Sequence, residues 1–281
     1  MIVIEQPGPL STVQDLGRPG LAHLGVSPSG AADRSAHHLA NRLVGNREDA
    51  ATIETTLGGL VIMMETLSWV AVTGAPTELL INSSVSSSHC SFPLRAGDRL
   101  TIQPPPVGLR NYLAIRGGVK ITRTLGSRST DMLSGLGPEP LRAGQRLKLC
   151  RPRRPLPDID LAPPNPPRRL VDLTPGPRRD WFTDQAWDAL LTEEWTATAD
   201  LNRVAVRLDG PQLDRRIGDE LPSEGLLRGA MQVPASGQPL IFLADHPVTG
   251  GYPVIAVLTD RAADHAAQLR PGDRVRFRLS S

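Results

Sequence analysis

Short β-prone runs, separated by turn residues, fill most of the sequence. The clearest runs are IVIEQ, GLVIMM, WVAVTG, TELLIN, RLTIQ, YLAIRGG, VAVRLDG, LIFLAD and PVIAVL. Gly, Pro, Ser or Asn stands between them, which is typical of strands joined by turns. The 27 prolines and 26 glycines in 281 residues also fit a chain with many tight turns. The pattern predicts a mainly β fold.

Two segments have helical periodicity instead. Residues 31–44 carry apolar residues at three- and four-residue spacing, and Gly45 follows them as a helix stop. Residues 184–194 follow Thr183, a candidate cap, and place an apolar stripe around Leu190. We therefore predict two short helices.

One short sequence motif recurs three times along the chain. The copies are LRAGDRLTI (residues 94–102), LRAGQRLKL (141–149) and LRPGDRVRF (269–277). Each predicts a turn on Gly-Asp or Gly-Gln, followed by a strand with its apolar residues on one face. The irregular spacing excludes a solenoid and suggests hairpins that close a β-barrel, with at least one copy in each half.

A proline-rich segment, RPRRPLPDIDLAPPNPPRR, separates the second copy from the third. Closely spaced prolines favour a stiff, extended connector over a core element. We therefore predict an N-terminal β-rich domain over residues 1–150, a linker over 151–169 and a C-terminal β-barrel domain over 170–281.

Charge and motif content exclude several classes of function. The net charge of +2, without a basic run interleaved with aromatics, does not predict a nucleic-acid surface. No glycine precedes either lysine, Lys120 or Lys148, so a self-contained P-loop ATPase is excluded. Without a Gly-x-Ser-x-Gly elbow, a free-standing serine hydrolase is not expected. Cys90 and Cys150 lack metal-ligand spacing and are interpreted as buried or idle thiols, so no metal site is predicted.

The sequence also carries information on the cellular compartment of the protein. Its N-terminus, MIVIEQPGPL, has no basic region ahead of its apolar residues, which does not fit a signal peptide. The longest apolar region, GLVIMMETLSWVAVTG, is interrupted by Glu65 and is too short to cross a membrane. We expect a cytoplasmic protein without a membrane partner.

Several motifs in register resemble those of one family. They are GPLSTVQDLGRPGLAHLGVSPSGAADRSAHHLANRLVGN, GSRSTD (residues 126–131), RLDGP (207–211), GAMQVPASGQPLIFLAD (229–245) and TGGYP (249–253). Together they resemble the C subunit of prokaryotic 5-oxoprolinase, also labelled allophanate hydrolase subunit 2, KipA-like, or the A-part of the urea carboxylase carboxyltransferase domain. The match extends from about Gly8 to Phe277. It implies a cyclophilin-like β-barrel architecture with two sub-domains.

The resemblance also implies partners and cofactors. Family members act with a B subunit (KipI-like), and in 5-oxoprolinase with an A subunit as well, to open 5-oxo-L-proline to glutamate with ATP. This chain would bind no cofactor alone and would be inactive alone, because ATP use belongs to the complex. In urea carboxylase the same unit transfers a carboxyl group from biotin, which a partner would carry here. A third alternative is a KipA-like regulatory protein that antagonises a kinase inhibitor.

The chain departs from the family pattern at a few positions. Val204 and Ala205 stand where a Met-Gly pair is usual, and Arg178 stands where a Gln is usual. These changes bear on the substrate more than on the fold. Gln145 replaces the usual Asp of the repeated turn, and we expect that change to cost only a turn hydrogen bond.

Candidate substrate-binding residues in the first half lie on turns and strand ends. Gln14, Asp15 and Arg18 combine an amide, an acid and a guanidinium, which could bind a carboxylate or amide substrate. The alternative is an Asp15–Arg18 turn pair that fixes the loop. Arg116 and Arg128 adjoin glycine- and hydroxyl-rich turns, at Gly117-Gly118 and in GSRSTD, whose amides suit an anion.

The first predicted helix carries further polar candidates. Asn41 lies beside its apolar face and could satisfy the backbone of a neighbouring loop or bind substrate. Ser29 or Asp33 is the candidate N-cap. His37 and His38 are adjacent, point in different directions and cannot bind one metal jointly.

The second half offers FLADHPVTGGYPVI. Asp245 ends an apolar run, and Thr249, Gly250, Gly251 and Tyr252 form a turn before the next. Paired glycines permit positive φ and expose amides that could stabilise an oxyanion, while Tyr252 could donate a hydrogen bond. The alternative is an ordinary hairpin with a packed tyrosine. We interpret this turn, together with Gln232, as the wall that faces the ligand.

Overall fold

The structure, a computed structural model, describes residues 1–165 and 168–280. Pro166 and Pro167, at the end of the predicted linker, lie outside the described residues, as does Ser281. The chain divides into two compact units. Unit 1 comprises residues 1–18, 29–131 and 135–166, and unit 2 comprises residues 19–28, 132–134 and 167–281. Segments 19–28 and 132–134 therefore belong to unit 2 although they are far from its main part in sequence.

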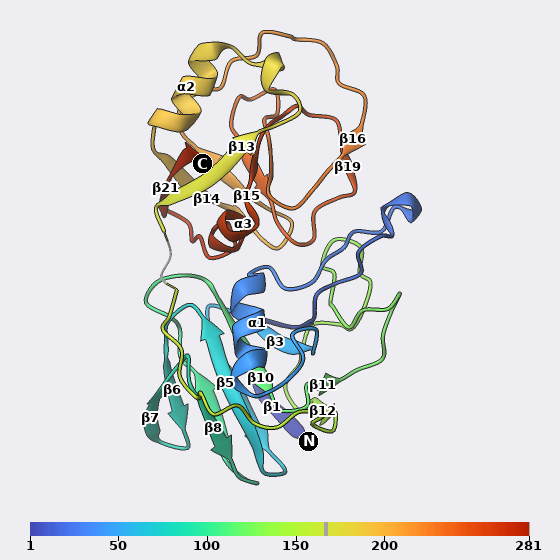
Figure 1. Cartoon of the computed structure of the whole chain (residues 1–281), viewed down its shortest axis with the longest axis vertical. Coiled ribbons are helices and arrows are strands. Elements are labelled where there is room, and N and C mark those ends of the chain that lie inside the picture. Colours follow the sequence, from blue (N-terminus) through green and yellow to red (C-terminus); the bar gives the residue numbers. More distant parts are fainter. Residues whose placement is uncertain (166–167, 281) are drawn as a thin grey trace. The chain divides into compact units, whose positions relative to one another are not determined.

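Two antiparallel sheets form the body of unit 1 (Figure 1). The first has the order β11-β12-β1-β4-β9-β6-β7. Its bounds are β1 (Ile2–Pro7), β4 (Leu60–Met64), β6 (Glu78–Ile81), β7 (Ser84–Ser87), β9 (Arg99–Ile102), β11 (Val119–Lys120) and β12 (Arg146–Leu149). The second has the order β2-β3-β10-β5-β8. Its bounds are β2 (Leu10–Gln14), β3 (Thr52–Thr56), β5 (Ser68–Gly74), β8 (Ser91–Leu94) and β10 (Arg110–Ile115).

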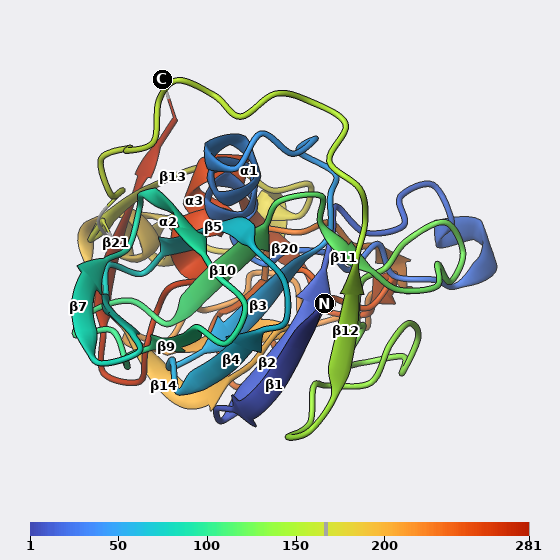
Figure 2. The same cartoon turned by 90° about the horizontal axis from the view of Figure 1, so that it is seen from below.

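The core of unit 1 lies between these sheets. Buried residues of β1 and β4, such as Ile4 and Ile62, pack with Val72 and Leu113 of the second sheet. In Figure 2, β1 lies between β12 and β4, as its pairing requires. Because β1 and β4 alternate buried with partly exposed residues, one face of the first sheet meets the core.

Helix α1 (Arg34–Leu43) covers the other face of the second sheet, against β5 and β10. Every residue of β10 is buried because the core lies on one side and α1 on the other. Asp33 caps the helix, accepting a hydrogen bond from the Ala36 amide at 2.9 Å. The predicted helix, and Asp33 as its cap, are confirmed.

A closed barrel forms the body of unit 2, in the order β13-β20-β17-β18-β15-β14-β21. Its bounds are β13 (Leu170–Pro175), β14 (Trp195–Leu201), β15 (Ala205–Asp209), β17 (Ala230–Gln232), β18 (Leu240–Phe242), β20 (Val254–Leu258) and β21 (Arg274–Leu279). β16 (Glu224–Gly225) and β19 (Thr249–Gly250) pair separately. The barrel buries Trp195, Phe182 and Phe277. The prediction of a mainly β fold with a β-barrel is confirmed.

Helices flank this barrel. α2 (Asp184–Thr192) begins after Thr183, whose hydroxyl accepts from the Ala186 amide at 3.1 Å, as predicted. The prediction of two helices is wrong in number, because the described residues include a third, α3 (Asp260–Ala266). Thr259 caps α3 in the same way, and alanines form its buried side. Short 3-10 turns complete unit 2, at Ala22–Leu24 and Arg179–Trp181.

The three repeated turns have the predicted conformation. Their glycines, Gly97, Gly144 and Gly272, have φ of 89°, 80° and 88°, and each turn precedes a strand. β21 closes the barrel between β13 and β14, whereas β9 and β12 lie in the first sheet of unit 1. The repeat therefore marks one local turn-and-strand design, which closes a barrel in one copy of three.

The proline-rich segment is extended and held along unit 1. The Ser91 amide donates to the Asp160 carbonyl at 2.7 Å, and the Ala162 amide donates to the His89 carbonyl at 2.9 Å. Arg116 Nη2 donates to the Arg154 carbonyl at 2.8 Å. The predicted linker role of residues 151–169 stays a prediction, since the described part of this segment is tied to unit 1 by backbone hydrogen bonds.

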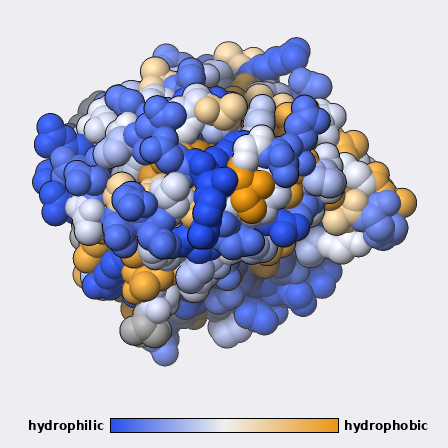
Figure 3. Space-filling model, turned by 90° about the horizontal axis from the view of Figure 1, so that it is seen from above, coloured by the Kyte–Doolittle hydropathy of each residue, from blue (hydrophilic) through white to orange (hydrophobic). Residues whose placement is uncertain are grey.

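The surface is mostly polar on the face shown in Figure 3, where hydrophobic residues gather only in small groups. Among the described residues, no helix has the length and apolar character needed to cross a membrane.

Candidate functional site

Asp15, directly after β2, clamps the loop that contains GSRSTD. Its Oδ1 accepts from the hydroxyls of Ser127 at 2.5 Å and Ser129 at 2.7 Å, and from the Gly17 amide at 2.9 Å. Its Oδ2 accepts from the Arg128 amide at 2.7 Å. The clamp joins two segments that carry the family resemblance. Asp15 therefore positions the loop, and the alternative of an Asp15–Arg18 turn pair is wrong, because the carboxylate binds the loop instead.

Arg18 is buried and only partly satisfied. Its Nη2 donates to the Ser129 carbonyl at 2.5 Å, while Nη1 lies 3.8 Å from Asp131 Oδ2. Nε and Nη1 have no hydrogen-bond partner among the described residues. Gly137 passes so close that a side chain there would collide with the Ser129 carbonyl, so the loop closes tightly over the guanidinium.

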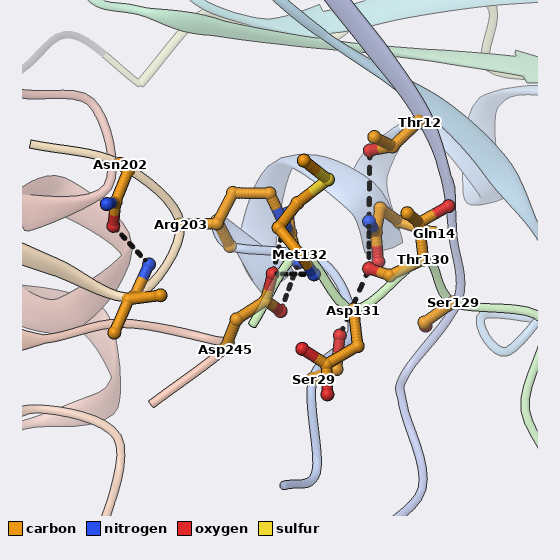
Figure 4. A network of polar contacts seen from close by, with 12 residues as sticks. Thr12, Gln14, Ser29, Ser129, Thr130, Asp131, Met132, Asn202, Arg203 and Asp245 are labelled. Atoms are coloured by element: carbon orange, nitrogen blue, oxygen red, sulfur yellow. Dashed lines mark hydrogen bonds and ion pairs between the residues drawn. The ribbon is translucent and has the colours of Figure 1, made fainter. Parts of the chain in front are cut away.

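Gln14 and Thr130 extend this group. Gln14 Nε2 donates to Thr12 Oγ1 and to the Thr130 carbonyl, both at 2.9 Å, and Ser29 Oγ donates to the same carbonyl at 3.2 Å (Figure 4). Gln14 Oε1 and Thr130 Oγ1, like the two Arg18 nitrogens, have no partner within residues 1–165 and 168–280. Buried polar atoms without partners are rare and require an explanation. We refer to Gln14, Arg18 and Thr130 as the Arg18 cluster.

The two fully buried polar residues of α1, His37 and Asn41, make hydrogen bonds within the protein. Asn41 Nδ2 donates to the Ala50 carbonyl at 2.9 Å, which confirms that it satisfies a neighbouring loop. His37 has Thr52 Oγ1 at 2.9 Å from Nδ1 and the Glu48 carbonyl at 2.9 Å from Nε2. Burial, and secondarily the charge of His38, lowers the pKa of His37 to about 4. The ring is therefore neutral at pH 7 and has a structural role.

Two arginine candidates in unit 1 also hold backbone. Arg116 Nη1 donates to the Val44 carbonyl at 3.1 Å, and Arg128 Nε donates to the Ile121 carbonyl at 2.9 Å. Gly117 and Gly118 have φ of 93° and 81°, as expected for this turn. Their amides, which were expected to suit an anion, are instead hydrogen-bonded within the chain. The Gly117 amide donates to Asn46 Oδ1 at 2.7 Å, and the Gly118 amide donates to the Ile115 carbonyl at 2.8 Å.

Cys90 does not have the environment of a nucleophile. It follows His89 directly, but its Sγ donates to the Ser87 carbonyl at 3.0 Å. Burial raises the pKa of the Cys90 thiol, which disfavours the reactive thiolate.

In unit 2, Asp245 forms a fully engaged pair with Arg203, which the sequence interpretation missed. Arg203 Nε and Nη2 donate to the two carboxylate oxygens at 2.9 Å each. The Met132 amide, also in unit 2, donates to Asp245 Oδ2 at 3.0 Å (Figure 4). Both side chains are buried. Asp245 is thus a structural lock in the described chain.

The predicted ligand-facing turn is the most exposed candidate. Tyr252 is 48% exposed, and Gln232, which is buried, donates from Nε2 to the Tyr252 carbonyl at 2.7 Å. A Cβ at Gly250 would lie 2.7 Å from that Nε2, so a larger residue there would displace the end of the Gln232 side chain. The prediction of positive φ is wrong, since neither Gly250 nor Gly251 is in the left-handed region and Gly250 lies in β19. We call Thr249–Tyr252 the Tyr252 wall.

Two further arginines lie close to the Tyr252 wall. Arg215 Nη2 donates to the carbonyl of Val233, the residue after Gln232, and burial lowers the pKa of Arg215. Arg178, one of the departures from the family pattern, forms an ion pair with Glu224, whose Nε–Oε2 distance is 3.1 Å. Glu224 pairs with Gly250 between β16 and β19, so this departure lies next to the wall. Arg215 could not be found from the sequence, because its contact with the Val233 carbonyl forms only in the fold.

The remaining departures from the family pattern, Val204 and Ala205, lie at a turn. The Val204 and Ala205 amides donate to Asn202 Oδ1 at 2.7 and 3.1 Å, so this turn is capped by a side chain. In the part of the chain that the structure describes, no group of three His, Cys, Asp or Glu side chains could hold a metal ion.

Unit 1 thus contributes a polar loop that Asp15 holds in place, and unit 2 contributes a barrel with an exposed turn at Tyr252. The family model for the carboxyltransferase domain, subdomains A and B, matches residues 24–279. The chain belongs to this family, which confirms the resemblance seen in its motifs.

The relatives include 5-oxoprolinase C subunits and urea amidolyases. The chain is 36% identical over 280 residues to the 5-oxoprolinase C subunit of Escherichia coli, covering 99% of this chain and 90% of that protein. It is 33% identical to urea amidolyase of Lachancea kluyveri, covering 98% of this chain and 16% of that protein. The solved structure of TTHA0988 matches with a TM-score of 0.90 and 34% identity, over 99% of this chain and 55% of that one. The K. lactis urea amidolyase structure matches with a TM-score of 0.92 and 29% identity, over 100% and 19%.

Proposed function

We propose that this chain is the C component of an ATP-dependent 5-oxoprolinase, which opens 5-oxo-L-proline to L-glutamate together with B and A subunits. The observation that carries the proposal is the sequence similarity to the 5-oxoprolinase relative. The chain is 36% identical to that relative over 280 residues, and 33% identical to the urea amidolyase relative over 303 residues.

The chemistry of this substrate suits the exposed candidates of unit 2. Ring opening adds water to the lactam carbonyl and breaks the C–N bond, and the ring nitrogen becomes the amino group of glutamate. Hydrogen-bond donors beside the carbonyl stabilise the charge that develops on its oxygen. In the proposal, the Tyr252 hydroxyl donates to the substrate, and Gln232 positions Tyr252 through its carbonyl. Arg215, which donates to the Val233 carbonyl next to Gln232, supplies positive charge to the same region.

The Arg18 cluster suits the carboxylate of the substrate. The unpartnered Nε and Nη1 of Arg18 are donors, and Gln14 Oε1 is an acceptor of the kind that a lactam N–H requires. The Arg18 side chain is fully covered in the chain as described. This role therefore requires that the loop over it moves when the B subunit or the substrate binds.

The test begins with the complex assembled from this chain and its A and B partners. ATP-dependent glutamate formation is measured with 5-oxoproline, and each subunit is omitted in turn. Product formation that requires all three chains supports the proposal. No turnover despite a firm complex with the B subunit would favour the regulatory alternative.

Variants then test the wall. Tyr252→Phe removes one hydrogen-bond donor and is expected to lower kcat/KM by about tenfold. Gln232→Leu is expected to lower it similarly, by releasing the Tyr252 backbone. The matched control is Gln238→Leu, because Gln238 makes the same kind of bond in unit 2, from Nε2 to the Gly210 carbonyl at 3.0 Å. Equal losses in all three variants would contradict a specific role of the wall.

The urea amidolyase relatives favour a second candidate function. The chain would accept a carboxyl group from biotin on a partner and transfer it to urea. The TM-score of 0.92 to the K. lactis urea amidolyase structure supports this candidate. Turnover only with urea, bicarbonate, ATP and a biotinylated partner would establish it and exclude the oxoprolinase proposal.

A further inference from the structure

A strongly basic cavity lies within unit 1, apart from the Arg18 cluster. Its volume is about 370 Å³. The whole chain nearly balances its charges, with 31 basic and 29 acidic residues, but the described lining of this cavity holds six arginines and one carboxylate, Asp49. The arginines are Arg47, Arg123, Arg128, Arg151, Arg153 and Arg154. The positive charge is therefore concentrated locally.

The chain neutralises little of this charge. Asp49 accepts from Arg47 Nε at 2.8 Å and Nη2 at 3.0 Å, so the only lining carboxylate is already engaged. That hydrogen bond lowers the pKa of Asp49, which keeps it ionised and paired. The other arginines of the lining have no carboxylate within 4 Å among the described residues. The cavity thus retains a clear excess of guanidinium groups.

The wall that carries three of these arginines is stiff. Arg151 and Arg154 each precede a proline in the stretch RPRRP, and a residue before proline is restricted to extended backbone. The segment is also packed closely. A side chain at Gly45 would collide with the Pro155 carbonyl, and one at Gly117 would collide with the Cys150 carbonyl. A fixed wall reduces the entropy lost when the arginines bind a ligand.

We propose that this cavity binds a small, multiply charged anion that carries phosphate groups. Guanidinium groups bind phosphate oxygens bidentately, and several of them suit a ligand with three or more negative charges. The remaining lining consists of glycine, alanine, valine, asparagine and cysteine residues, without an aromatic ring on which a base could stack. Recognition is therefore of the phosphate groups. The volume suits one small ligand rather than a nucleic-acid strand.

Calorimetric titration of the full chain with tripolyphosphate, pyrophosphate, phosphate and citrate, at constant ionic strength, tests the proposal. Affinity is expected to rise from phosphate to pyrophosphate to tripolyphosphate, and tripolyphosphate is expected to bind more tightly than citrate. Arg151→Gln combined with Arg153→Gln should weaken tripolyphosphate binding by about tenfold or more. The matched control, Arg95→Gln with Arg261→Gln, removes the same charge at exposed positions outside the cavity. It should change affinity by less than about twofold.

Four results would overturn the proposal. They are absence of tripolyphosphate binding up to about 1 mM, equal weakening by the control pair, tighter binding of citrate, and affinity for single-stranded oligonucleotides that grows with their length. Arg123→Gln provides a second variant, read in the same titration, if the double variant does not fold. The proposal does not depend on the 5-oxoprolinase assignment, because the titration needs no partner and no turnover.

Discussion

Each unit buries an arginine–aspartate pair, but the two pairs differ in how well their polar atoms are satisfied. In unit 2, Arg203 and Asp245 form two hydrogen bonds of 2.9 Å. In unit 1, Arg18 Nη1 lies 3.8 Å from Asp131 Oδ2, and neither Nε nor Nη1 has a hydrogen-bond partner among the described residues. A saturated buried pair can serve the fold alone, whereas an unsaturated one keeps binding capacity for a ligand. The contrast separates a structural lock from a candidate binding group.

Breaking the saturated pair should have the largest effect. Asp245→Asn removes the charge opposite Arg203 and places an amide donor against guanidinium donors. The free energy of unfolding should fall by about 3–5 kcal/mol, measured by urea denaturation. The double variant Arg203→Met with Asp245→Leu should recover most of that loss, since it leaves no buried charge unpaired. A loss below about 1 kcal/mol in Asp245→Asn would refute the lock.

The next largest effect is the pH dependence of stability that the buried His37 of unit 1 should cause. Its pKa is lowered from 6.5 unfolded to about 4 folded, mainly by burial. Because the unfolded state binds the proton more readily, stability is fully present above pH 6.5 and is lost as pH falls toward 4. The loss across this window should be about 3 kcal/mol. Urea unfolding at pH 7, 5.5 and 4 measures it.

His37→Gln should flatten this pH dependence, because the titrating group is gone. His23, which is exposed, provides the matched control, and His23→Gln should leave the profile unchanged. If the wild-type and His37→Gln profiles have the same slope between pH 4 and 6.5, the titration arises elsewhere.

Arg18→Met should have a smaller effect on stability than Asp245→Asn. The ion pair is long and Nε and Nη1 of Arg18 have no hydrogen-bond partner within the described residues, so the free energy of unfolding should fall by about 2 kcal/mol. In the assembled complex, KM for 5-oxoproline should rise by about tenfold, because a charged hydrogen bond to the carboxylate is lost. A variant that loses stability as Asp245→Asn does, with unchanged KM, would make Arg18 another lock.

Local patterns explain what could be predicted from the sequence. Strands and the caps of α1 and α2 depend on residues within a few positions of one another, and these predictions are confirmed. α3 was missed because its seven residues are too few for a clear helical period. The Thr259-Asp260 start and the alanines that follow were the available signal.

The candidate site was predictable in its residues more than in their roles. Asp15 binds Ser127, 112 positions away, and Asp245 binds Arg203, 42 positions away. Neither partner is marked by local spacing. Gly250 was expected to supply a left-handed turn, yet in the fold its lack of a side chain leaves room for the side chains of Gln232 and Leu226. Long-range packing, which no local pattern encodes, decides these roles.

The smallest predicted effect compares one turn design in both units. Gln145 Oε1 accepts from the Arg142 amide at 3.1 Å, where Asp98 and Asp273 accept at 2.7 and 2.8 Å from the equivalent amides. The expected loss of this hydrogen bond is therefore wrong, because the longer side chain still reaches the amide.

Gln145→Asp should shorten the bond and order fewer rotatable bonds, raising the free energy of unfolding by about 0.5 kcal/mol. The midpoint of urea unfolding should rise at an unchanged m-value. Asp98→Gln in unit 1 and Asp273→Gln in unit 2 should shift it the other way by similar amounts. Opposite signs for those two variants would mean that the surroundings of each unit, rather than the reach of the side chain, decide the strength of the turn.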